Sequence, residues 1–123
     1  MASFKFKKFA RSFKYAGRGL VHLIQTEQNA QVHLLATVLL GALALYFKLS
    51  ATESAVLFFA VVLVFAIEII NTAVEKLLDI VHPEHHSQIA FIKDALAGSV
   101  LIAAVIAFVV AVALFWPHIK LWL

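Results

Sequence analysis

Polar side chains recur at helical spacing within an otherwise apolar part of the chain. They stand at positions i, i+3, i+7 and i+11: Glu68, Asn71, Glu75 and Asp79. This spacing places all four within about 80° of one another on one face of a helix. A carboxylate at membrane depth is unfavourable and needs a partner, a proton or a metal, so this polar stripe is a candidate functional site. The alternative is a proton-sharing or salt-bridge network between subunits.

The oxygen atoms of the polar stripe suit a hard divalent cation. Glu68 and Glu75 lie two helical turns apart with Asn71 between them, and Mg²⁺ prefers oxygen ligands of this kind. Glu27, on the preceding polar segment, is a further carboxylate that would complete the set. The sequence therefore predicts a Mg²⁺ site built on these side chains.

A second charged group precedes the last apolar segment of the chain. Here a lysine ammonium can neutralise a phosphate, and an aspartate can orient it or hold a metal: Lys93 and Asp94. Beside a cluster of carboxylates, this pair predicts a polyphosphate bound through Mg²⁺. The alternative is that the pair only marks the edge of the membrane.

Neither G-x-x-x-x-G-K-[ST] nor G-x-G-x-x-G occurs in the sequence, so a nucleotide would not be held by a glycine-rich loop. The neighbouring histidines His85 and His86 cannot both ligate a metal from one helical face. We expect them to contact phosphate rather than zinc.

The composition indicates the environment in which these residues are positioned. Hydrophobic residues make up 63% of the 123 residues and charged residues 14%, against roughly 45–50% and about 25% in an ordinary soluble domain. The chain is therefore not a water-soluble globule, and its length supports a single domain, residues 1–123. The absence of cysteine excludes a disulfide framework, a thiolate nucleophile and zinc–thiolate or iron–sulfur sites.

The N-terminal segment is basic on one side and apolar on the other. The cations before residue 20 are Lys5, Lys7, Lys8, Arg11, Lys14 and Arg18, and the apolar positions are Phe6, Phe9, Phe13, Ala16 and Leu20. We predict an amphipathic surface helix over about residues 4–26, bound to an anionic membrane surface rather than to nucleic acid. Tyr15 lies among the cations, as an ordinary interfacial residue or as an aromatic contact to a polar ligand.

Three apolar segments follow and predict an all-α integral membrane fold. We expect transmembrane helices over about residues 31–48, 54–79 and 88–116. The S-x-x-E sequence of residues 50–53 predicts a capping box, residues 82–87 a polar turn, and Pro117 the end of the third span. Since cations mark the cytoplasmic side, the N-terminus is expected inside and the C-terminus outside.

The motifs resemble those of a known family. Residues 68–75 read EIINTAVE, Asp79 follows, and residues 93–100 read KDALAGSV. These are similar to the E-x-x-N-[ST]-A-x-E…D and K-D signatures of the small prokaryotic diacylglycerol kinase and undecaprenol kinase family. The resemblance covers about residues 13–107. It implies a homotrimer of three-span protomers in the bacterial plasma membrane, transferring the γ-phosphate of ATP to a lipid hydroxyl.

The resemblance implies roles for individual residues. Glu68 would be the general base at the lipid hydroxyl, and Glu27 with Glu75 would bind Mg²⁺. The residues implied to contact ATP are Tyr15, Asn71, Glu84, His85, His86, Lys93 and Asp94. Lys8 and Arg11, also candidate lipid-substrate residues, match basic positions of the family's surface helix only approximately. Ala16 stands where the enterobacterial branch has a serine.

The segment from Glu27 to His33 bears on the choice of lipid. Its E-x-N-x-x-x-H form is more similar to the Gram-positive branch, which favours undecaprenol, and it makes Asn29 and His33 candidate lipid-substrate residues. The alternatives are that Asn29 is a helix cap and His33 a helix-end histidine with no substrate role.

Three functions remain open at this point. The first is a Mg²⁺- and ATP-dependent lipid kinase, producing undecaprenyl phosphate or phosphatidic acid. The others are a small oligomeric transporter or channel with an intramembrane glutamate relay, and a structural membrane subunit. Because one protomer has few elements with which to cover the polar stripe, we expect active sites shared between protomers, with Glu27 of one beside Glu68 and Glu75 of another.

Overall fold

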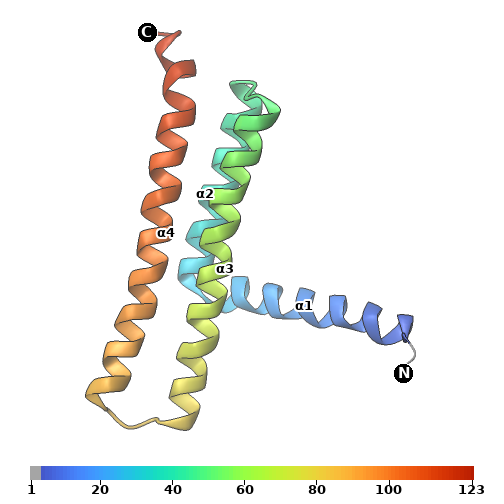
Figure 1. Cartoon of the computed structure of the whole chain (residues 1–123), viewed down its shortest axis with the longest axis vertical. Helices are drawn as coiled ribbons and strands as arrows, with labels where there is room; N and C mark the ends of the chain where they lie inside the picture. The colour runs from blue at the N-terminus through green and yellow to red at the C-terminus, as the bar shows by residue number, and fades with distance from the viewer. Residues whose placement is uncertain (1–3) are drawn as a thin grey trace.

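The structure is a computed structural model that describes residues 4–123, so the first three positions of the predicted domain lie outside it. Throughout the described part the chain is helical, apart from short connections. The four helices are α1 (Phe6–Thr26), α2 (Gln28–Tyr46), α3 (Ala51–Val81) and α4 (Ser87–Lys120). Figure 1 shows α2, α3 and α4 running alongside one another, with α1 projecting sideways.

Helix length explains how these elements relate to a membrane. Three helices, α2, α3 and α4, are long and apolar enough to cross one. The 19 residues of α2 give about 28 Å of helix, close to the ~30 Å hydrocarbon core of a bilayer. The 31 residues of α3 and 34 of α4 give about 46 and 51 Å. Both continue past the level at which α1 leaves (Figure 1), so their joined ends project into water when α2 spans the hydrocarbon.

The connection between α3 and α4 lies where the sequence predicts it, but the end of α4 does not. Residues 82–86 form the predicted non-helical turn between α3 and α4. However, α4 runs through Pro117 and ends at Lys120, so the prediction that Pro117 ends this element is wrong for the helix. A proline removes one backbone donor. This loss is tolerated here because only one turn follows, closed by the Trp122 amide donating to the Ile119 carbonyl at 2.9 Å.

The end of the bundle away from α1 is closed by a capped turn. The Ser50 hydroxyl accepts from the Glu53 amide at 3.1 Å, and the Glu53 carboxylate accepts from the Ser50 amide at 2.8 Å. This is the predicted capping box. The other Glu53 oxygen lies 3.3 Å from Nε2 of His118, so the start of α3 is tied to the end of α4. Beneath it a small core contains Leu57 and Phe115.

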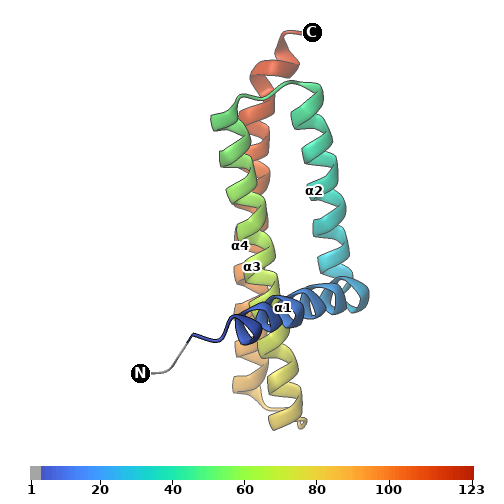
Figure 2. The same ribbon diagram turned by 90° about the vertical axis from the view of Figure 1, so that its right-hand side faces the viewer.

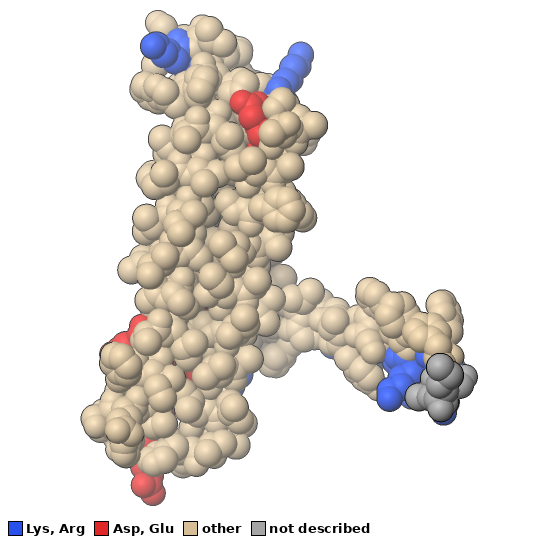
Figure 3. All heavy atoms as spheres, in the orientation of Figure 1, with Lys and Arg blue, Asp and Glu red and all other residues tan. Residues whose placement is uncertain are grey.

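The remaining apolar surface of the bundle is largely exposed in a single chain. Only 6% of the most apolar stretch of α2 is buried, and α2 packs less extensively against α3 than α4 does. Figure 2 shows α2 standing apart from the α3–α4 pair. The middle of the bundle shows no charged atoms on the face seen in Figure 3, whereas Lys and Arg gather at the free end of α1. Lipid or another protein chain must therefore cover this surface.

Removing the Ser50 cap should destabilise the start of α3. We expect Ser50→Ala to lower the free energy of unfolding by about 0.5–2 kcal/mol, because the Glu53 amide loses its acceptor. Reversible unfolding in mixed detergent micelles measures this. Ser54→Ala, at a serine within the first turn of α3, is the control and should remain close to wild type. Equal loss in both variants would contradict a specific capping contribution.

Candidate active site

The most buried charged side chain among the described residues is Glu68 on α3. It is 2% exposed, and its Oε2 atom has no hydrogen-bond partner. The charges that act on it are those of His33, Glu27 and Glu75. A buried carboxylate oxygen without a partner is unfavourable for folding. It is nevertheless suited to accept a proton or a hydrogen bond from a bound molecule.

The polar stripe is divided by depth. Glu68 and Asn71 are buried, whereas Glu75 and Asp79 are exposed. The reason is the antiparallel pairing of α2 with α3, because the start of α2 lies beside the part of α3 near Glu68. Beyond that level α3 has no α2 alongside it. The stripe therefore begins at the inner edge of the bundle and continues into water.

Glu27 lies at the junction where the chain changes direction. It is the single extended residue between α1 and α2, and the Gln31 side-chain amide donates to the Ile24 carbonyl across this junction at 3.0 Å. The Oε1 atom of Glu27 accepts from Nζ of Lys76, on α3, at 2.8 Å. This hydrogen bond to the ammonium holds the pKa of the Glu27 carboxyl below its usual value.

Within one chain Glu27 is near enough to Glu68 to act on it electrostatically. The expectation that Glu27 of one protomer acts beside Glu68 and Glu75 of another stays a prediction. Sequence reasoning missed Lys76. The available signal was its isolation, because it is the one Lys or Arg between Lys48 and Lys93 and follows directly after Glu75.

A second ion pair joins α3 to α4. Lys93 of α4 donates to Oδ1 of Asp79 of α3. The ammonium predicted to contact phosphate is therefore bound to a carboxylate of the polar stripe. Asp94, the next residue, is exposed. Asp79 lies eleven residues beyond Glu68, about 16 Å along the helix.

Other predicted site residues lie apart from Glu68 in a single chain. Tyr15 is exposed on α1, twelve residues or about 18 Å of helix before Glu27. Lys8 and Arg11, further out on the same helix, are also exposed.

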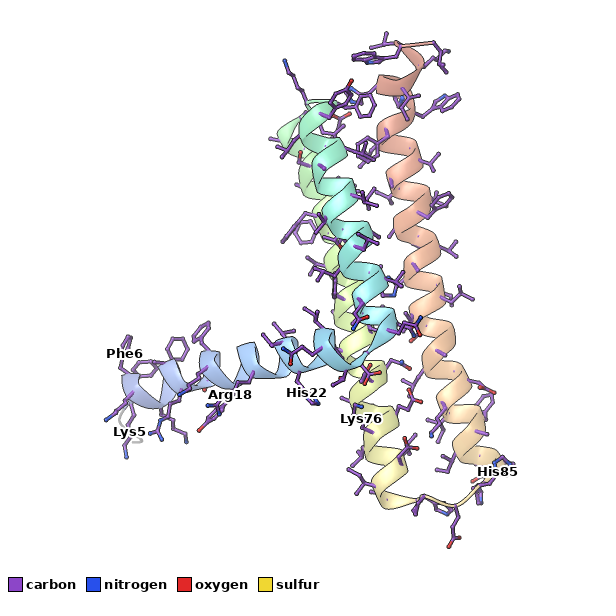
Figure 4. The ribbon with its side chains drawn as sticks, turned by 180° about the vertical axis from the view of Figure 1, so that it is seen from behind. Lys5, Phe6, Arg18, His22, Lys76 and His85 are labelled. Carbon is purple, nitrogen blue, oxygen red and sulfur yellow. The ribbon has the colours of Figure 1, made fainter. Side chains whose placement is uncertain are left out.

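The predicted ATP contacts in the α3–α4 turn are also separated from Glu68. Glu84, His85 and His86 are exposed there. Figure 4 shows His85 at this turn, whereas Lys76 lies nearer to the α1–α2 junction. The His86 ring is already engaged, since its Nδ1 caps α4 by accepting from the Gln88 amide at 3.2 Å.

The candidate lipid-substrate residues lie at the start of α2. Asn29 is exposed in the first turn and is not the cap, because Glu27 holds the N-cap position. His33 is half-buried and its ring contacts that of Phe65. His33 and Thr37 line the polar edge of an apolar groove of about 410 Å³ between α2, α3 and α4.

A second groove lies between α1 and α3, with a volume of about 450 Å³. It is lined mainly by apolar side chains such as Leu20 and Leu23, and His22, Thr26, Thr72 and Lys76 also contribute to its wall. An apolar chain matches this lining.

A metal would depend on ligands beyond those of one chain. Within residues 4–123 no group of three or more His, Asp or Glu side chains is arranged to hold a metal ion by itself. Mg²⁺, however, is usually held by one or two carboxylates together with nucleotide phosphates. Glu27 and Glu75 fit that requirement, and Glu27 already binds a cation, the Lys76 ammonium.

The family described as prokaryotic diacylglycerol kinase matches residues 14–115. The chain belongs to this family. Its members here include an undecaprenol kinase of Bacillus subtilis, 33% identical over 91% of this chain and 91% of its own length.

Two diacylglycerol kinases are also similar. That of Synechocystis is 35% identical over 86% of this chain, although the match spans only 61% of the relative. That of Escherichia coli K12 is 27% identical over 92% of this chain and 93% of its own length.

As a member of the prokaryotic diacylglycerol kinase family, the protein is a membrane lipid kinase, a phosphotransferase. The family resemblance predicted from the motifs is confirmed. The transporter and structural-subunit alternatives are not favoured.

The Glu68 oxygen without a hydrogen-bond partner should lower the stability of the protein, so replacing Glu68 should stabilise the fold. Glu68→Met should raise the free energy of unfolding by about 1–3 kcal/mol, because a buried polar atom without a partner is removed. Glu75→Met makes the same change at an exposed position of the stripe and should alter stability by less than about 0.5 kcal/mol. Unfolding of both variants without substrate provides the comparison. A loss of stability in Glu68→Met would mean that the carboxylate makes a structural bond.

Proposed function

We propose that this lipid kinase transfers the γ-phosphate of ATP, with Mg²⁺, to the hydroxyl of undecaprenol or diacylglycerol. The products are undecaprenyl phosphate or phosphatidic acid together with ADP. One observation carries the proposal: the buried Glu68 carboxylate has an oxygen without a partner at the level where α1 leaves the bundle. A lipid headgroup would be present at that depth.

In the proposed step Glu68 accepts the proton of the lipid hydroxyl. The hydroxyl oxygen then forms a bond to the γ-phosphorus, and the bond from that phosphorus to the β,γ-bridging oxygen breaks. The electron pair of the broken bond stays with ADP. Glu27 and Glu75 would hold Mg²⁺, which when bound supplies neutralisation of charge on the phosphates.

The remaining residues would bind the nucleotide. Asn71 lies one turn beyond Glu68 and would contact phosphate. Lys93 and Asp94 would act further out, and Tyr15 and the segment 84–86 would contact the rest of ATP.

The lipid would enter beside α1. We infer that α1 lies on the cytoplasmic surface, with Lys8 and Arg11 among the headgroups. The groove between α1 and α3 would bind the apolar chain of the lipid. The N-terminus would then be cytoplasmic and the C-terminus outside, in a bacterial plasma membrane.

Undecaprenol is the preferred candidate lipid. Asn29 and His33 reproduce the Gram-positive pattern, and this pattern supports the choice. Sequence identity does not, because it is 33% to the Bacillus undecaprenol kinase but 35% and 27% to the Synechocystis and Escherichia coli diacylglycerol kinases. The decisive experiment follows transfer of labelled γ-phosphate to undecaprenol and to diacylglycerol in the same detergent. Faster labelling of undecaprenol is expected. Labelling of neither lipid would contradict the proposal.

Homotrimeric assembly would explain two features of the single chain. Its apolar faces are exposed, and its Lys93 is bound to Asp79, about 16 Å along α3 from Glu68. In the single chain Lys93 is therefore held at Asp79 rather than beside Glu68. We propose that the Lys93 acting at each site belongs to another protomer.

This arrangement predicts complementation. Inactive Glu68→Ala and inactive Lys93→Ala proteins, mixed through dissociation and reassembly, should regain activity at about one site in four, the share that draws intact residues from both parents. Labelled-lipid formation measures the recovery, and tag pull-down verifies mixing. Mixed oligomers without recovery would place both residues of a site in one chain.

Glu68 and Glu75 should differ in role although they share a face. Glu75→Gln is expected to weaken Mg·ATP binding by about tenfold or more, because a metal ligand loses its charge. Glu68→Gln should bind Mg·ATP almost normally while transfer falls by at least about 10²-fold, the usual contribution of a general base. Nucleotide binding by equilibrium dialysis and single-turnover transfer separate the two effects. Equal loss of Mg·ATP affinity would disprove this division.

A further inference from the structure

Lys76 has no role in the proposed function, yet it contacts one of its central residues. Its Nζ lies 2.8 Å from Oε1 of Glu27, and the two side chains are 53% and 29% exposed. The lysine also lines the groove between α1 and α3. Figure 4 shows it on α3 close to the α1–α2 junction.

The ion pair blocks the site that Glu27 would offer to a metal. An ammonium and a divalent cation cannot occupy the same carboxylate oxygen, and their like charges repel at short distance. Metal binding by Glu27 is therefore opposed while Lys76 stays in place, because the ammonium occupies Oε1 and repels a cation at either oxygen. The geometry permits Lys76 to move away, because a lysine has a flexible four-carbon stem and this one is more than half exposed.

Charge balance explains why a cation is present in the metal-free protein. Glu27 and Glu75 both act electrostatically on the buried Glu68. Without a metal, three carboxylates would repel one another around the junction. Lys76 offsets that repulsion and ties the junction of α1 and α2 to α3. Its departure would leave Glu27 and Glu75 for the arriving metal and free the ammonium to approach phosphate oxygens.

We propose that Lys76 is a positioning residue that holds Glu27 in the metal-free protein and releases it when the metal and nucleotide bind. The proposal rests on the proposed function, in which Glu27 is a metal ligand. Lys76 acts through Glu27 rather than on the reacting atoms.

Binding of Mn²⁺ without nucleotide tests the proposal independently of activity. Free Mn²⁺ is measured by its electron paramagnetic resonance signal over purified protein in detergent. The variants are Lys76→Met, Lys76→Gln, Lys76→Arg, Glu27→Gln and the double variant Lys76→Met/Glu27→Gln. Lys14→Met on exposed α1 controls for the loss of one positive charge elsewhere.

Removing the ammonium should tighten Mn²⁺ binding roughly three- to tenfold in both neutral Lys76 variants, as expected from the loss of a part-exposed ion pair and of cation repulsion. Lys76→Arg and Lys14→Met should bind as wild type does, and Glu27→Gln should abolish the gain in the double variant. A role limited to packing α1 against α3 would change thermal stability without raising metal affinity.

The possible failures are distinguishable. If Glu27→Gln alone leaves Mn²⁺ binding unchanged, Glu27 is not a metal ligand and that part of the proposed function fails together with this inference. If Glu27→Gln weakens binding but neither Lys76→Met nor Lys76→Gln tightens it, only the role of Lys76 is overturned. Lys76→Gln retains a polar side chain, so the test remains valid if Lys76→Met does not fold.

Discussion

Hydrocarbon solvates charge poorly, and α2 has just enough residues to cross it. The length of α2 determines where Glu27 and Glu68 lie relative to the edge of the hydrocarbon. Glu27 joins α1 to α2 at the edge of the hydrocarbon where α2 begins. The antiparallel helix α3 comes back to this edge near Glu68. Carboxylates beyond this level project into water, and those before it must be buried or paired. The glutamate without a partner occurs at this boundary, where substrates from both phases can meet.

Two lysine–carboxylate pairs determine how α3 is held at its polar end. Lys76 binds Glu27 on one side, and Asp79 binds Lys93 of α4 on the other. Each pair is partly exposed, so neither contributes much to stability in water. Their value is positional, because they keep the neighbouring elements in register around Glu68. In the proposed function, pairs of this strength would be exchanged for stronger ligands when a nucleotide and metal bind.

Much of the fold was predictable because it follows from local sequence. Apolar stretches of sufficient length predict the three spans, and the Ser50 and Glu53 spacing predicts the capping box. Helical periodicity correctly placed Glu68 and Glu75 on one face, but periodicity contains no information about depth, so the division of that face into buried and exposed halves was not foreseen. The Lys76–Glu27 pair joins residues 49 positions apart. It depends on the direction of the chain at Glu27, which no local pattern specifies.

With Glu68 as the proposed base, its position would also decide which substrate concentrations control the rate. A donor dissolved in water reaches the exposed half of α3 by diffusion in three dimensions. A lipid alcohol reaches the buried half by lateral diffusion in two, so its effective concentration is its mole fraction in the membrane. Diluting the lipid alcohol with other lipids lowers its concentration at the site, whereas diluting the whole suspension with water does not. Under this proposal the rate would follow the composition of the membrane, independently of how much membrane there is.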